Sequence, residues 1–473
     1  MTKNFILDTN VLIDDPDAIF KMDDNNVIIT DVTLKELDRF KKEESERGFN
    51  ACAATKNLDE ASRNGNLTDG ISLGEGKGML KMMFTLRDKA KSFPTDIFPL
   101  DLDENDNRLI YLAYRNPGFI IVTKDRNLRL RANSVMVKSE TYKNDQVYEN
   151  PNSKKYTGRT SVYLLPGVLN QFKKDGYLNI ETVKGVGYTA NGEPFDEELF
   201  INEFFEMYPI RDNSDGRESA LLGRFDGKRI VPLRYADAPM SGVHPRNIGQ
   251  YFMQECLLQP SSVAPLVVIK GVAGTAKTFF AMAAGLEKYR NSTDREFYHR
   301  IMVCRPYVLM DKDPGALPGT ELDKVSPLIR PVKDNLAEII RSGSDSKSEH
   351  EFQQTEEEVE NLFESGIVKA EAFAFLRGRT LKHYWFVLDE MQNSSPMQAK
   401  TAITRSGIGS KFILLGDPEQ IDNPRNTPQS NGLVYASEKM KGSPLCWQVQ
   451  LTQEEGERSA LAMEAAIRMK GRK

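Results

Sequence analysis

A short stretch of small residues ending in Lys-Thr is the part of this sequence best suited to chemistry. The segment GVAGTAKT spans residues 271–278, after the apolar run 265–269 and before an alanine-rich stretch at 279–286. The apolar run predicts a buried strand, and the stretch after the loop predicts a helix. Backbone N–H groups of such a loop can surround phosphate oxygens, and the helix dipole favours negative charge. The pattern therefore predicts a nucleotide-phosphate site.

Individual positions of this loop have expected roles. Lys277 would reach the β- and γ-phosphates of ATP, and the Thr278 hydroxyl would bind Mg²⁺. The other predicted nucleotide contacts in the loop are Gly271, Ala273, Gly274, Thr275 and Ala276. Ala276 stands where the usual GxxxxGK[ST] pattern has glycine. If the backbone there needs a positive φ, alanine costs roughly 1 kcal/mol more than glycine, which a bound nucleotide could offset. The alternative is an ordinary strand–turn–helix rich in small residues.

Two acidic residues end another predicted strand in the same region. The run 383–388 (HYWFVL) leads into Asp389 and Glu390. Asp389 would hold the water shell of Mg²⁺ and Glu390 would polarise the attacking water, which is the Walker B arrangement. Further strands are predicted at 300–305, 411–415 and 445–451. About five strands with helical crossovers predict a RecA-like P-loop ATPase core.

Four carboxylates near the N-terminus form a second candidate site. Asp8 and Asp125 directly follow predicted strands, and Glu36 and Asp106 are expected in the first turns of predicted helices. Alternating strands and helices predict a parallel sheet, whose ligand sites lie at the carboxyl ends of the strands. Four carboxylates converging there would need one or two Mg²⁺ or Mn²⁺ ions. Such ions activate water and stabilise the leaving oxygen in phosphodiester hydrolysis.

Each of these carboxylates also has a purely structural alternative. Thr33 and Glu36 have the spacing of a capping box, and Asp103 could be the N-cap of the helix that contains Asp106. Asp8, followed by Thr-Asn, could belong to a turn. Taken one at a time, the structural role is the better interpretation, so the argument for a metal site depends on the four residues together.

Composition limits the classes of function. A chain of 473 residues predicts two or three domains, and a net charge of −5 places any nucleic-acid site on a local patch. The four cysteines and four histidines are scattered, which leaves carboxylates as the metal ligands. The N-terminus has no signal-peptide pattern, and no apolar run reaches membrane-spanning length, so we expect a cytoplasmic protein without a membrane partner.

The remaining segments predict a linker, a middle module and an insertion. The polar stretch 150–158 is typical of a linker. Strands are then predicted at 161–165, 177–180, 203–208, 219–225 and 229–233, with a hairpin turn at 226–227. They favour a small β-rich, barrel-like module, which either binds single-stranded nucleic acid or acts as a spacer. The acidic segment 342–360 predicts a partly disordered surface insertion. We expect an α/β multidomain protein with domains at 1–148, 159–240 and 244–473.

The N-terminal motifs resemble those of PIN-domain ribonucleases over roughly the first 140 residues. That family has an apolar strand ending in DTN, a TxxEL segment, an Asp opening a helix and a TxD after a strand, which match here at Asp8, Glu36, Asp106 and Asp125. The resemblance implies a metal-dependent ribonuclease. Asp103 could replace Asp106 in the site. A basic run beside Asp125 could compensate RNA phosphates or simply be solvated; it consists of Lys124, Arg126, Arg129 and Arg131.

The C-terminal region resembles the PhoH-like ATPases, which are related to superfamily I helicases. The resemblance rests on matching segments at 247–250, 305–306, 315–319, 387–393, 415–420 and 457–459. It implies that Gln250 reads adenine. It also implies that Arg458 is an arginine finger acting on ATP in a neighbouring subunit, and hence a hexameric ring. The alternative for Arg458 is a surface arginine in a charged run. Arg405 is a second candidate finger or a nucleic-acid contact.

Together the two regions resemble the bacterial PIN–PhoH fusion proteins. The resemblance implies an ATP-dependent RNA helicase coupled to a metal-dependent endoribonuclease, with RNA, ATP and Mg²⁺ or Mn²⁺ as its ligands. One alternative is a nucleotide-dependent RNA-binding switch whose PIN domain binds without cutting. Another is a toxin-like nuclease regulated by the ATPase. A small antitoxin-like regulator is a further candidate partner. Nothing in the sequence names a 2′-OH contact that would distinguish RNA from DNA.

Overall fold

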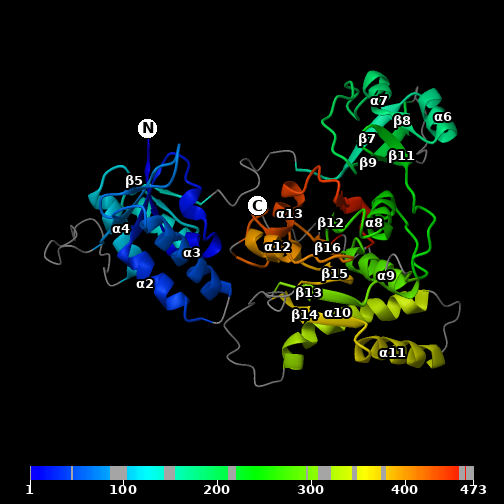
Figure 1. Ribbon diagram of the computed structural model, residues 1–473. Coiled ribbons are helices and arrows are strands. Elements are labelled where there is room, and N and C mark those ends of the chain that lie inside the picture. Colours follow the sequence, from blue (N-terminus) through cyan, green and yellow to red (C-terminus); the bar gives the residue numbers. More distant parts are fainter. Residues whose placement is uncertain are drawn as a thin grey trace. The chain divides into compact units, whose positions relative to one another are not determined.

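The computed structural model describes most of the chain, and its contacts divide it into two compact units. The described residues are 2–43, 46–85, 104–142, 155–210, 220–293, 297–306, 321–342, 349–373, 380–424, 426–457 and 464. The N-terminal unit spans Met1–Glu149 and the C-terminal unit spans Asn150–Lys473 (Figure 1). Within the described residues, no helix is both long and apolar enough to cross a membrane.

The N-terminal unit contains a six-stranded sheet with the order β3-β4-β2-β1-β5-β6. Its strands are β1 (Asn4–Leu7), β2 (Asn26–Thr30), β3 (Ile71–Ser72), β4 (Met79–Met83), β5 (Phe119–Val122) and β6 (Ser139–Glu140). All neighbouring pairs are parallel except β3 and β4, which are antiparallel. This α/β arrangement confirms the predicted fold class of the N-terminal region.

Helices cover both faces of this sheet, because successive strand residues point to opposite sides. The helices are α1 (Thr9–Asp14), α2 (Asp31–Phe40), α3 (Glu46–Ser62), α4 (Asn105–Arg115) and α5 (Arg126–Ser134), and a short 3₁₀ turn covers Ala18–Phe20. In β1, Phe5 and Leu7 join the core formed with α1, α2 and α3. Ile6, between them, joins the core formed with α4 and α5. The two-sided burial explains the short, fully apolar strands.

The C-terminal unit is built on an all-parallel six-stranded sheet with the order β14-β13-β15-β16-β12-β17. Its strands are β12 (Leu266–Lys270), β13 (Arg300–Arg305), β14 (Val368–Ala372), β15 (Tyr384–Leu388), β16 (Lys411–Gly416) and β17 (Cys446–Gln450). Its helices are α8 (Ile248–Leu258), α9 (Lys277–Arg290), α10 (Glu321–Ser342), α11 (Glu349–Glu364), α12 (Pro396–Ile403) and α13 (Gly432–Lys439), and 3₁₀ turns cover Met391–Asn393 and Gln453–Glu455.

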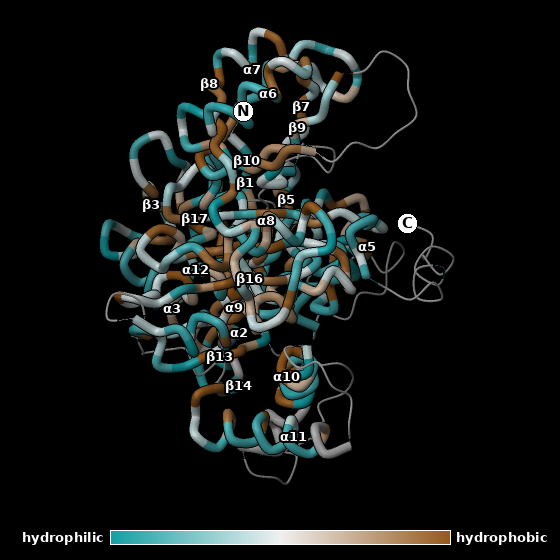
Figure 2. Tube along the Cα trace, turned by 90° about the vertical axis from the view of Figure 1, so that its right-hand side faces the viewer, coloured by the Kyte–Doolittle hydropathy of each residue, from teal (hydrophilic) through white to brown (hydrophobic). Residues whose placement is uncertain are grey.

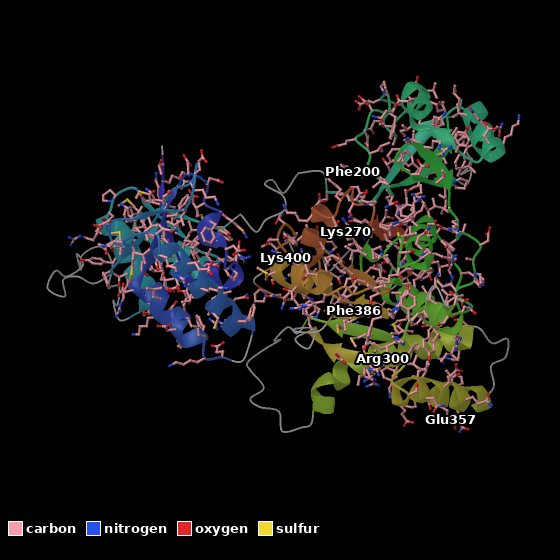
Figure 3. All side chains as sticks on the ribbon, viewed as in Figure 1. Phe200, Lys270, Arg300, Glu357, Phe386 and Lys400 are labelled. Carbon is pink, nitrogen blue, oxygen red and sulfur yellow. The ribbon has the colours of Figure 1, made fainter. Side chains whose placement is uncertain are left out.

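Apolar residues concentrate in the strands of this sheet (Figure 2). Along β12, Val267 and Ile269 pack in one core, whereas Leu266 and Val268 pack in the other. Phe386 of β15 is fully buried in the second core (Figure 3). The parallel P-loop architecture predicted for this region is confirmed, with β14 as a sixth strand that the sequence pattern did not predict.

The acidic segment 342–360 differs from its prediction as a partly disordered insertion. Residues 343–348 lie outside the described part, but Glu349–Glu364 forms helix α11. Val359 and Leu362 of this helix are buried in the core shared with α9 and α10. The few apolar residues are spaced so that they share one helix face, which anchors an otherwise acidic helix.

The middle module is an open sheet with the order β7-β9-β10-β11-β8. Its strands are β7 (Arg159–Leu164), β8 (Leu178–Asn179), β9 (Phe204–Pro209), β10 (Leu221–Phe225) and β11 (Arg229–Pro232). Among the described strands β7 and β8 lie at the edges, so the expected barrel-like closure is wrong. Helices α6 (Pro166–Asp175) and α7 (Ile180–Val186) were not predicted, and the second replaces the end of the strand expected at 177–180. The turn at 226–227 joins β10 to β11 as predicted.

A buried ion-pair network joins the middle sheet to the ATPase-like core. The Arg159 guanidinium donates from Nε to Glu206 of β9 at 2.6 Å and from Nη1 to Glu455 at 2.8 Å. All three side chains are about nine-tenths buried. Phe204 of β9 also stacks on Phe252 of α8, with ring centroids 4.6 Å apart. The middle sheet is therefore part of the same compact unit as the nucleotide loop.

Gly285 in α9 allows a prediction about packing. A Cβ on Gly285 would lie 2.6 Å from Nε1 of Trp385, whose buried indole donates to the Ala281 carbonyl oxygen at 3.0 Å. Alanine gains about 1 kcal/mol of helix propensity over glycine, but overpacking a fixed indole costs about 1–3 kcal/mol. We expect Gly285→Ala to lower the denaturation midpoint. Gly185→Ala in α7, where a Cβ meets nothing within 4 Å, is the control and should be neutral or stabilising. A stabilised Gly285→Ala variant would contradict this packing.

Candidate functional site

The loop between β12 and α9 holds its lysine through backbone carbonyls. Lys277 Nζ donates to the carbonyl oxygens of Gly271 at 2.7 Å and Val272 at 3.0 Å. The Thr275 hydroxyl donates to the same Val272 oxygen at 2.8 Å, which closes the loop on itself. The loop thus places one ammonium group at the amino end of α9, where the helix dipole also favours an anion.

Ala276 adopts a left-handed backbone conformation, in which alanine is less favourable than glycine. Its backbone has φ 60° and ψ 23°, in the left-handed region. Gly274, two residues earlier, also has a positive φ of 85°. The usual GxxxxGK[ST] pattern has glycine at the position of Ala276, because glycine adopts the left-handed region without a Cβ penalty. Alanine is tolerated here at an energetic cost.

Asp389 connects the loop to the neighbouring strands. It follows β15 and its side chain is only 4% exposed. Its Oδ2 accepts hydrogen bonds from the Thr278 hydroxyl at 3.1 Å and from Nε and Nη2 of Arg305 at 3.1 and 2.7 Å. Its Oδ1 accepts from the backbone N–H of Glu390 at 3.0 Å. Thr278 and Asp389, predicted from separate motifs to act on one Mg²⁺, are therefore in direct contact.

Arg305 is a site residue that the sequence argument noted only within a family segment. It ends β13, the strand beside β15, so strand register places it next to Asp389. A buried carboxylate needs a compensating cation, and the guanidinium supplies one here. A Mg²⁺ ion bound through Asp389 would meet this positive charge. The available signal was an arginine at the end of a predicted strand adjacent to the one carrying Asp389.

Gln392 links Glu390 to the next strand end. Glu390 has a positive φ of 54°, and its Oε2 accepts from Gln392 Nε2 at 2.6 Å. Gln392 is fully buried, and its Oε1 accepts from the backbone N–H of Asp417 at 3.2 Å. Burial raises the pKa of Asp417, and the charge of Lys277 opposes that shift. Glu390, Asp417 and the loop lysine therefore lie around one site.

Gln250 reaches the same region from the start of α8. Its side-chain Nε2 donates to Glu457 at 2.7 Å, and its Oε1 accepts from the backbone N–H of Arg246 at 2.8 Å. The backbone N–H of Glu457 in turn donates to the carbonyl oxygen of Gly274. Glu457, which the sequence argument had given no role of its own, thus bridges Gln250 and the loop. Arg458 lies outside the described residues. Arg405, at the end of α12, is half-buried with its Nε unbonded among the described atoms.

In the N-terminal unit, Thr123 connects the carboxylates at the ends of β1 and β5. Its fully buried hydroxyl donates to Asp8 Oδ2 at 2.6 Å. The Thr123 hydroxyl oxygen itself accepts from Asn10 Nδ2 at 3.1 Å and from the backbone N–H of Asp125 at 2.9 Å. Asp125 also caps α5, because its Oδ1 accepts from Asn127 N at 2.7 Å. The threonine of the TxD motif is therefore a positioning residue that the sequence argument missed.

Glu36 and Asp106 approach from α2 and α4. Asp106 lies in the first turn of α4 as predicted, but Glu36 is the sixth residue of α2 and not in its first turn. Glu36 accepts from Asn105 Nδ2 at 2.7 Å, and Asp106 accepts from Arg131 Nη2 at 2.6 Å. The capping-box alternative for Glu36 is wrong, because Thr30 is the N-cap of α2. Asp103 lies outside the described residues.

Electrostatics show that these carboxylates affect one another. The pKa of Asp8 is raised to about 7, mainly by burial and also by the charges of Asp106 and Glu36, while the Thr123 hydrogen bond opposes the shift. Burial also raises the pKa of Asp106, with contributions from Asp125 and Glu36 and an opposing one from Arg131. Carboxylate oxygens suit Mg²⁺ or Mn²⁺. Among the described residues, however, no three acidic, histidine or cysteine side chains are arranged to hold an ion.

The strained alanine of the loop provides a stability test. Ala276→Gly removes a penalty of about 1–2 kcal/mol for a Cβ in the left-handed region. It also raises the conformational entropy of the unfolded chain, which offsets part of this gain in stability. We expect a net stabilisation of up to about 1 kcal/mol, measured as the midpoint of urea unfolding. Ala273→Gly, in the same loop but without a positive φ, carries only the entropy cost and should be the less stable of the two variants. The reverse order would rule out the left-handed conformation.

Comparison with known proteins gives a family for each part of the chain. Residues 5–143 match the family model described as PIN domain, and residues 242–469 match the one described as PhoH-like protein. A PhoH-like protein of Bacillus subtilis (strain 168) is 37% identical over 172 residues, which cover 36% of this chain and 48% of that protein.

Relatives that extend over nearly the whole chain include two proteins named PhoH2. Protein PhoH2 of Thermobispora bispora is 27% identical over 462 residues, covering 96% of this chain and 94% of that protein. Protein PhoH2 of Bacillus subtilis (strain 168) is 32% identical over 477 residues, covering 98% of this chain and 99% of that protein. The resemblances inferred from the motifs are confirmed. The chain belongs to the PhoH2 proteins, with a PIN domain in its N-terminal part and a PhoH domain in its C-terminal part.

Proposed function

We propose that this protein is an ATP-dependent RNA helicase coupled to a Mg²⁺- or Mn²⁺-dependent endoribonuclease. The PIN nuclease-like and PhoH ATPase-like domains support a nucleotide-dependent, RNA-related function in general. The observation that carries the ATPase part of the proposal is the contact between Thr278 and Asp389, from motifs more than a hundred residues apart. This contact joins a phosphate loop to an acidic strand end, as ATP hydrolysis requires.

In the ATPase part, each residue has a defined task. Lys277 would neutralise phosphate charge, and Thr278 with Asp389 would hold Mg²⁺, which withdraws charge from the phosphates when bound. Glu390 would orient and polarise the attacking water, and its contact with Gln392 fixes the carboxylate. Gln250 would read adenine. Arg458 would act on ATP bound by a neighbouring subunit of a hexameric ring, as the family resemblance implies.

In the PIN part, the carboxylates would hold the metal ions that support phosphodiester hydrolysis. Asp8, Asp106, Asp125 and Glu36 supply the oxygen ligands that such ions require. Arg131 holds Asp106 and would have to release it for all four to share an ion. Because the pKa of Asp8 lies at about 7, protons and metal ions compete for this carboxylate near neutral pH.

A second candidate function is a nucleotide-dependent switch whose PIN domain binds RNA without cutting it. The ion pair between Arg131 and Asp106 favours it, since a permanently paired Asp106 would not bind metal. Calorimetric titration with Mn²⁺ distinguishes the two functions. Binding at millimolar concentration or below supports the nuclease, and no binding supports the switch. A small antitoxin-like regulator remains part of either proposal.

Variants of the two sites should separate the two activities. Lys277→Ala removes the cation of the phosphate loop, so we expect loss of ATP-driven unwinding with cleavage of unstructured RNA retained. Asp8→Asn removes a metal ligand and should do the reverse. Unwinding of a duplex RNA with a single-stranded tail is measured on a native gel, and cleavage of RNA on a denaturing gel, both in Mg²⁺ with and without ATP. Loss of both activities in Lys277→Ala would contradict separable sites, and unchanged cleavage in Asp8→Asn would remove Asp8 from the mechanism.

The burial of Asp8 predicts a pH-dependent stability. Its folded pKa of about 7 exceeds the ordinary value of 3.8, so the folded state binds more protons and loses stability as pH rises from about 4 to 7. Asp8→Asn removes this loss. Without divalent ions, we expect Asp8→Asn to be the more stable protein at pH 8 by on the order of 2–4 kcal/mol, with little difference near pH 4. The measurement is thermal unfolding across this range.

Added Mn²⁺ supplies the control for that experiment. An ion bound at the ionised carboxylates should stabilise the wild-type chain at pH 8 and leave the Asp8→Asn variant less affected. Parallel stability curves for the two proteins from pH 4 to 8 would show that Asp8 is not perturbed by burial.

A further inference from the structure

Helix α5 divides the basic run beside Asp125 into two groups with different contacts. Arg131 points to the carboxylate site, where Nη1 donates to Glu104 at 2.9 Å and Nη2 to Asp106 at 2.6 Å. Lys124, just before the helix, pairs with Asp14 at 3.2 Å. These two cations therefore have carboxylate partners within the unit. The sequence could not distinguish them from the rest of the run.

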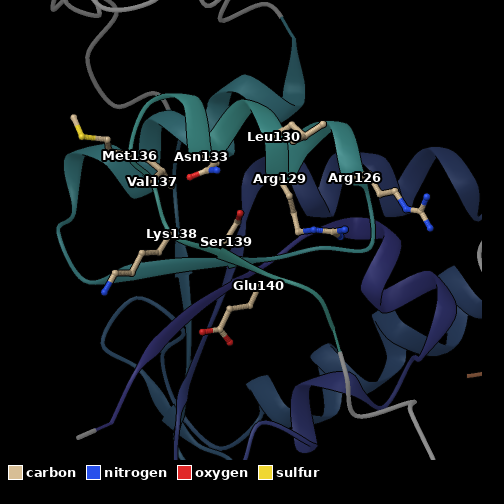
Figure 4. A pocket seen from close by; sticks show the side chains of 9 residues that line it. All are labelled: Arg126, Arg129, Leu130, Asn133, Met136, Val137, Lys138, Ser139 and Glu140. Atoms are coloured by element: carbon tan, nitrogen blue, oxygen red, sulfur yellow. The ribbon is translucent and has the colours of Figure 1, made fainter. Parts of the chain in front are cut away.

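The other two arginines lie on a different face of α5. Arg126, Arg129, Leu130 and Asn133 have the i, i+3, i+4, i+7 spacing of one helix face. This face borders a cavity of about 810 Å³, whose opposite side is formed by residues 136–140 leading into and along β6 (Figure 4). Among the described strands, β6 is one of the two edge strands of the sheet. The cavity therefore lies between a helix face and a sheet edge, entirely within the N-terminal unit.

The lining of this cavity carries a net positive charge that lining carboxylates do not neutralise. The lining contains three cations, of which Arg126 and Lys138 are exposed and have no ion-pair partner among the described residues. Arg129 donates from Nη1 to the Thr123 carbonyl oxygen at 3.1 Å, which leaves its other N–H groups available. The single lining carboxylate, Glu140, lies 3.5 Å from Lys3. In a chain with a net charge of −5, such a surface is a local exception.

The cavity also borders the carboxylate site. Arg126 directly follows Asp125, and Arg129 bonds the backbone of Thr123, whose hydroxyl positions Asp8. None of the nine lining residues is aromatic, and the exposed apolar ones are Leu130 and Met136. Cations without stacking rings suit contacts with phosphates, which carry no sequence information directly.

We propose that this α5–β6 cavity binds the sugar–phosphate backbone of single-stranded RNA next to the point of cleavage. Arg126 and Lys138 contact phosphates, and Leu130 and Met136 contact sugars. Arg129 joins this track to the carboxylates through Thr123. The inference rests on the proposed function, because it takes RNA as the ligand. It adds the position of the RNA strand on the N-terminal unit and a reason why binding there is independent of RNA sequence.

The test measures RNA binding by the full chain in the Asp8→Asn background, which prevents cleavage. A fluorescein-labelled single-stranded RNA is titrated at several salt concentrations against chains carrying Arg126→Gln with Lys138→Gln. Each lost phosphate contact should lower the slope of log affinity against log salt by about 0.7. We expect a slope smaller by about 1.4 and an affinity about tenfold weaker at low salt.

The matched control carries Lys56→Gln on α3 with Arg63→Gln directly after that helix. It removes the same total charge, and both side chains are largely exposed and paired with carboxylates of α3. We expect its salt slope to equal that of the parent. In parallel, RNA containing 4-thiouridine is cross-linked to the parent chain, and peptides are mapped. Cross-links within residues 126–140 are expected.

The outcomes separate this inference from the proposed function. Failure of the parent chain to bind RNA at all would overturn both. Tight RNA binding with an unchanged slope in Arg126→Gln with Lys138→Gln, and cross-links only elsewhere, would overturn the cavity alone and leave the surface to a protein partner. An equal loss in the α3 control would also overturn it, since the effect would then be one of net charge.

Discussion

Burying carboxylates at the carboxyl ends of parallel strands is the constraint that shapes both parts of this protein. Asp8 follows β1 and Asp389 follows β15, and both are nearly inaccessible to solvent. An uncompensated charge in such a place is strongly destabilising. The surrounding residues can therefore be understood by how each unit compensates its buried acid. The two units do so differently.

In the C-terminal unit, protein donors surround the acid. Asp389 receives bonds from Thr278, from Arg305 and from the backbone of Glu390. In the N-terminal unit, the donor to Asp8 is the neutral hydroxyl of Thr123, and neighbouring carboxylates add to the cost of ionisation. Asp8 therefore holds a proton up to about pH 7. A site that favours a proton in this way also favours a metal ion, which neutralises several carboxylates at once.

The segment 455–457 connects three parts of the C-terminal unit. Glu455 binds Arg159 of the middle sheet and accepts from the backbone N–H of Gly249 in α8 at 2.8 Å. Glu457 binds Gln250 and the phosphate loop. A Cβ on Gly249 would lie 2.5 Å from the Glu455 carboxylate, so the close approach requires glycine. The middle sheet is thus bonded to the segment that contacts the nucleotide loop, whereas an independent spacer would lack these contacts.

Local patterns were sufficient for most strands of the C-terminal sheet, for the phosphate loop and for the order of the acidic motifs, because short apolar runs and glycine-rich loops have few alternative structures. They failed for α11 and for the middle sheet. Two apolar contacts against a distant core decide that Glu349–Glu364 is ordered, and strand pairing decides whether a sheet closes. The prediction that Glu36 lies in a first helical turn was also wrong. The Thr30 cap starts α2 early enough that Glu36 is already past its first turn.

The sequence by itself determined which residues could carry chemistry, since Asp8, Asp125, Lys277, Thr278 and Asp389 belong to motifs whose spacing is local. Only the tertiary structure decided how their charges are compensated. Arg305 reaches Asp389 because β13 lies beside β15, and Arg131 reaches Asp106 because α5 packs beside α4. Strand order and helix packing bring together residues that are distant in sequence, and no local pattern encodes those distances.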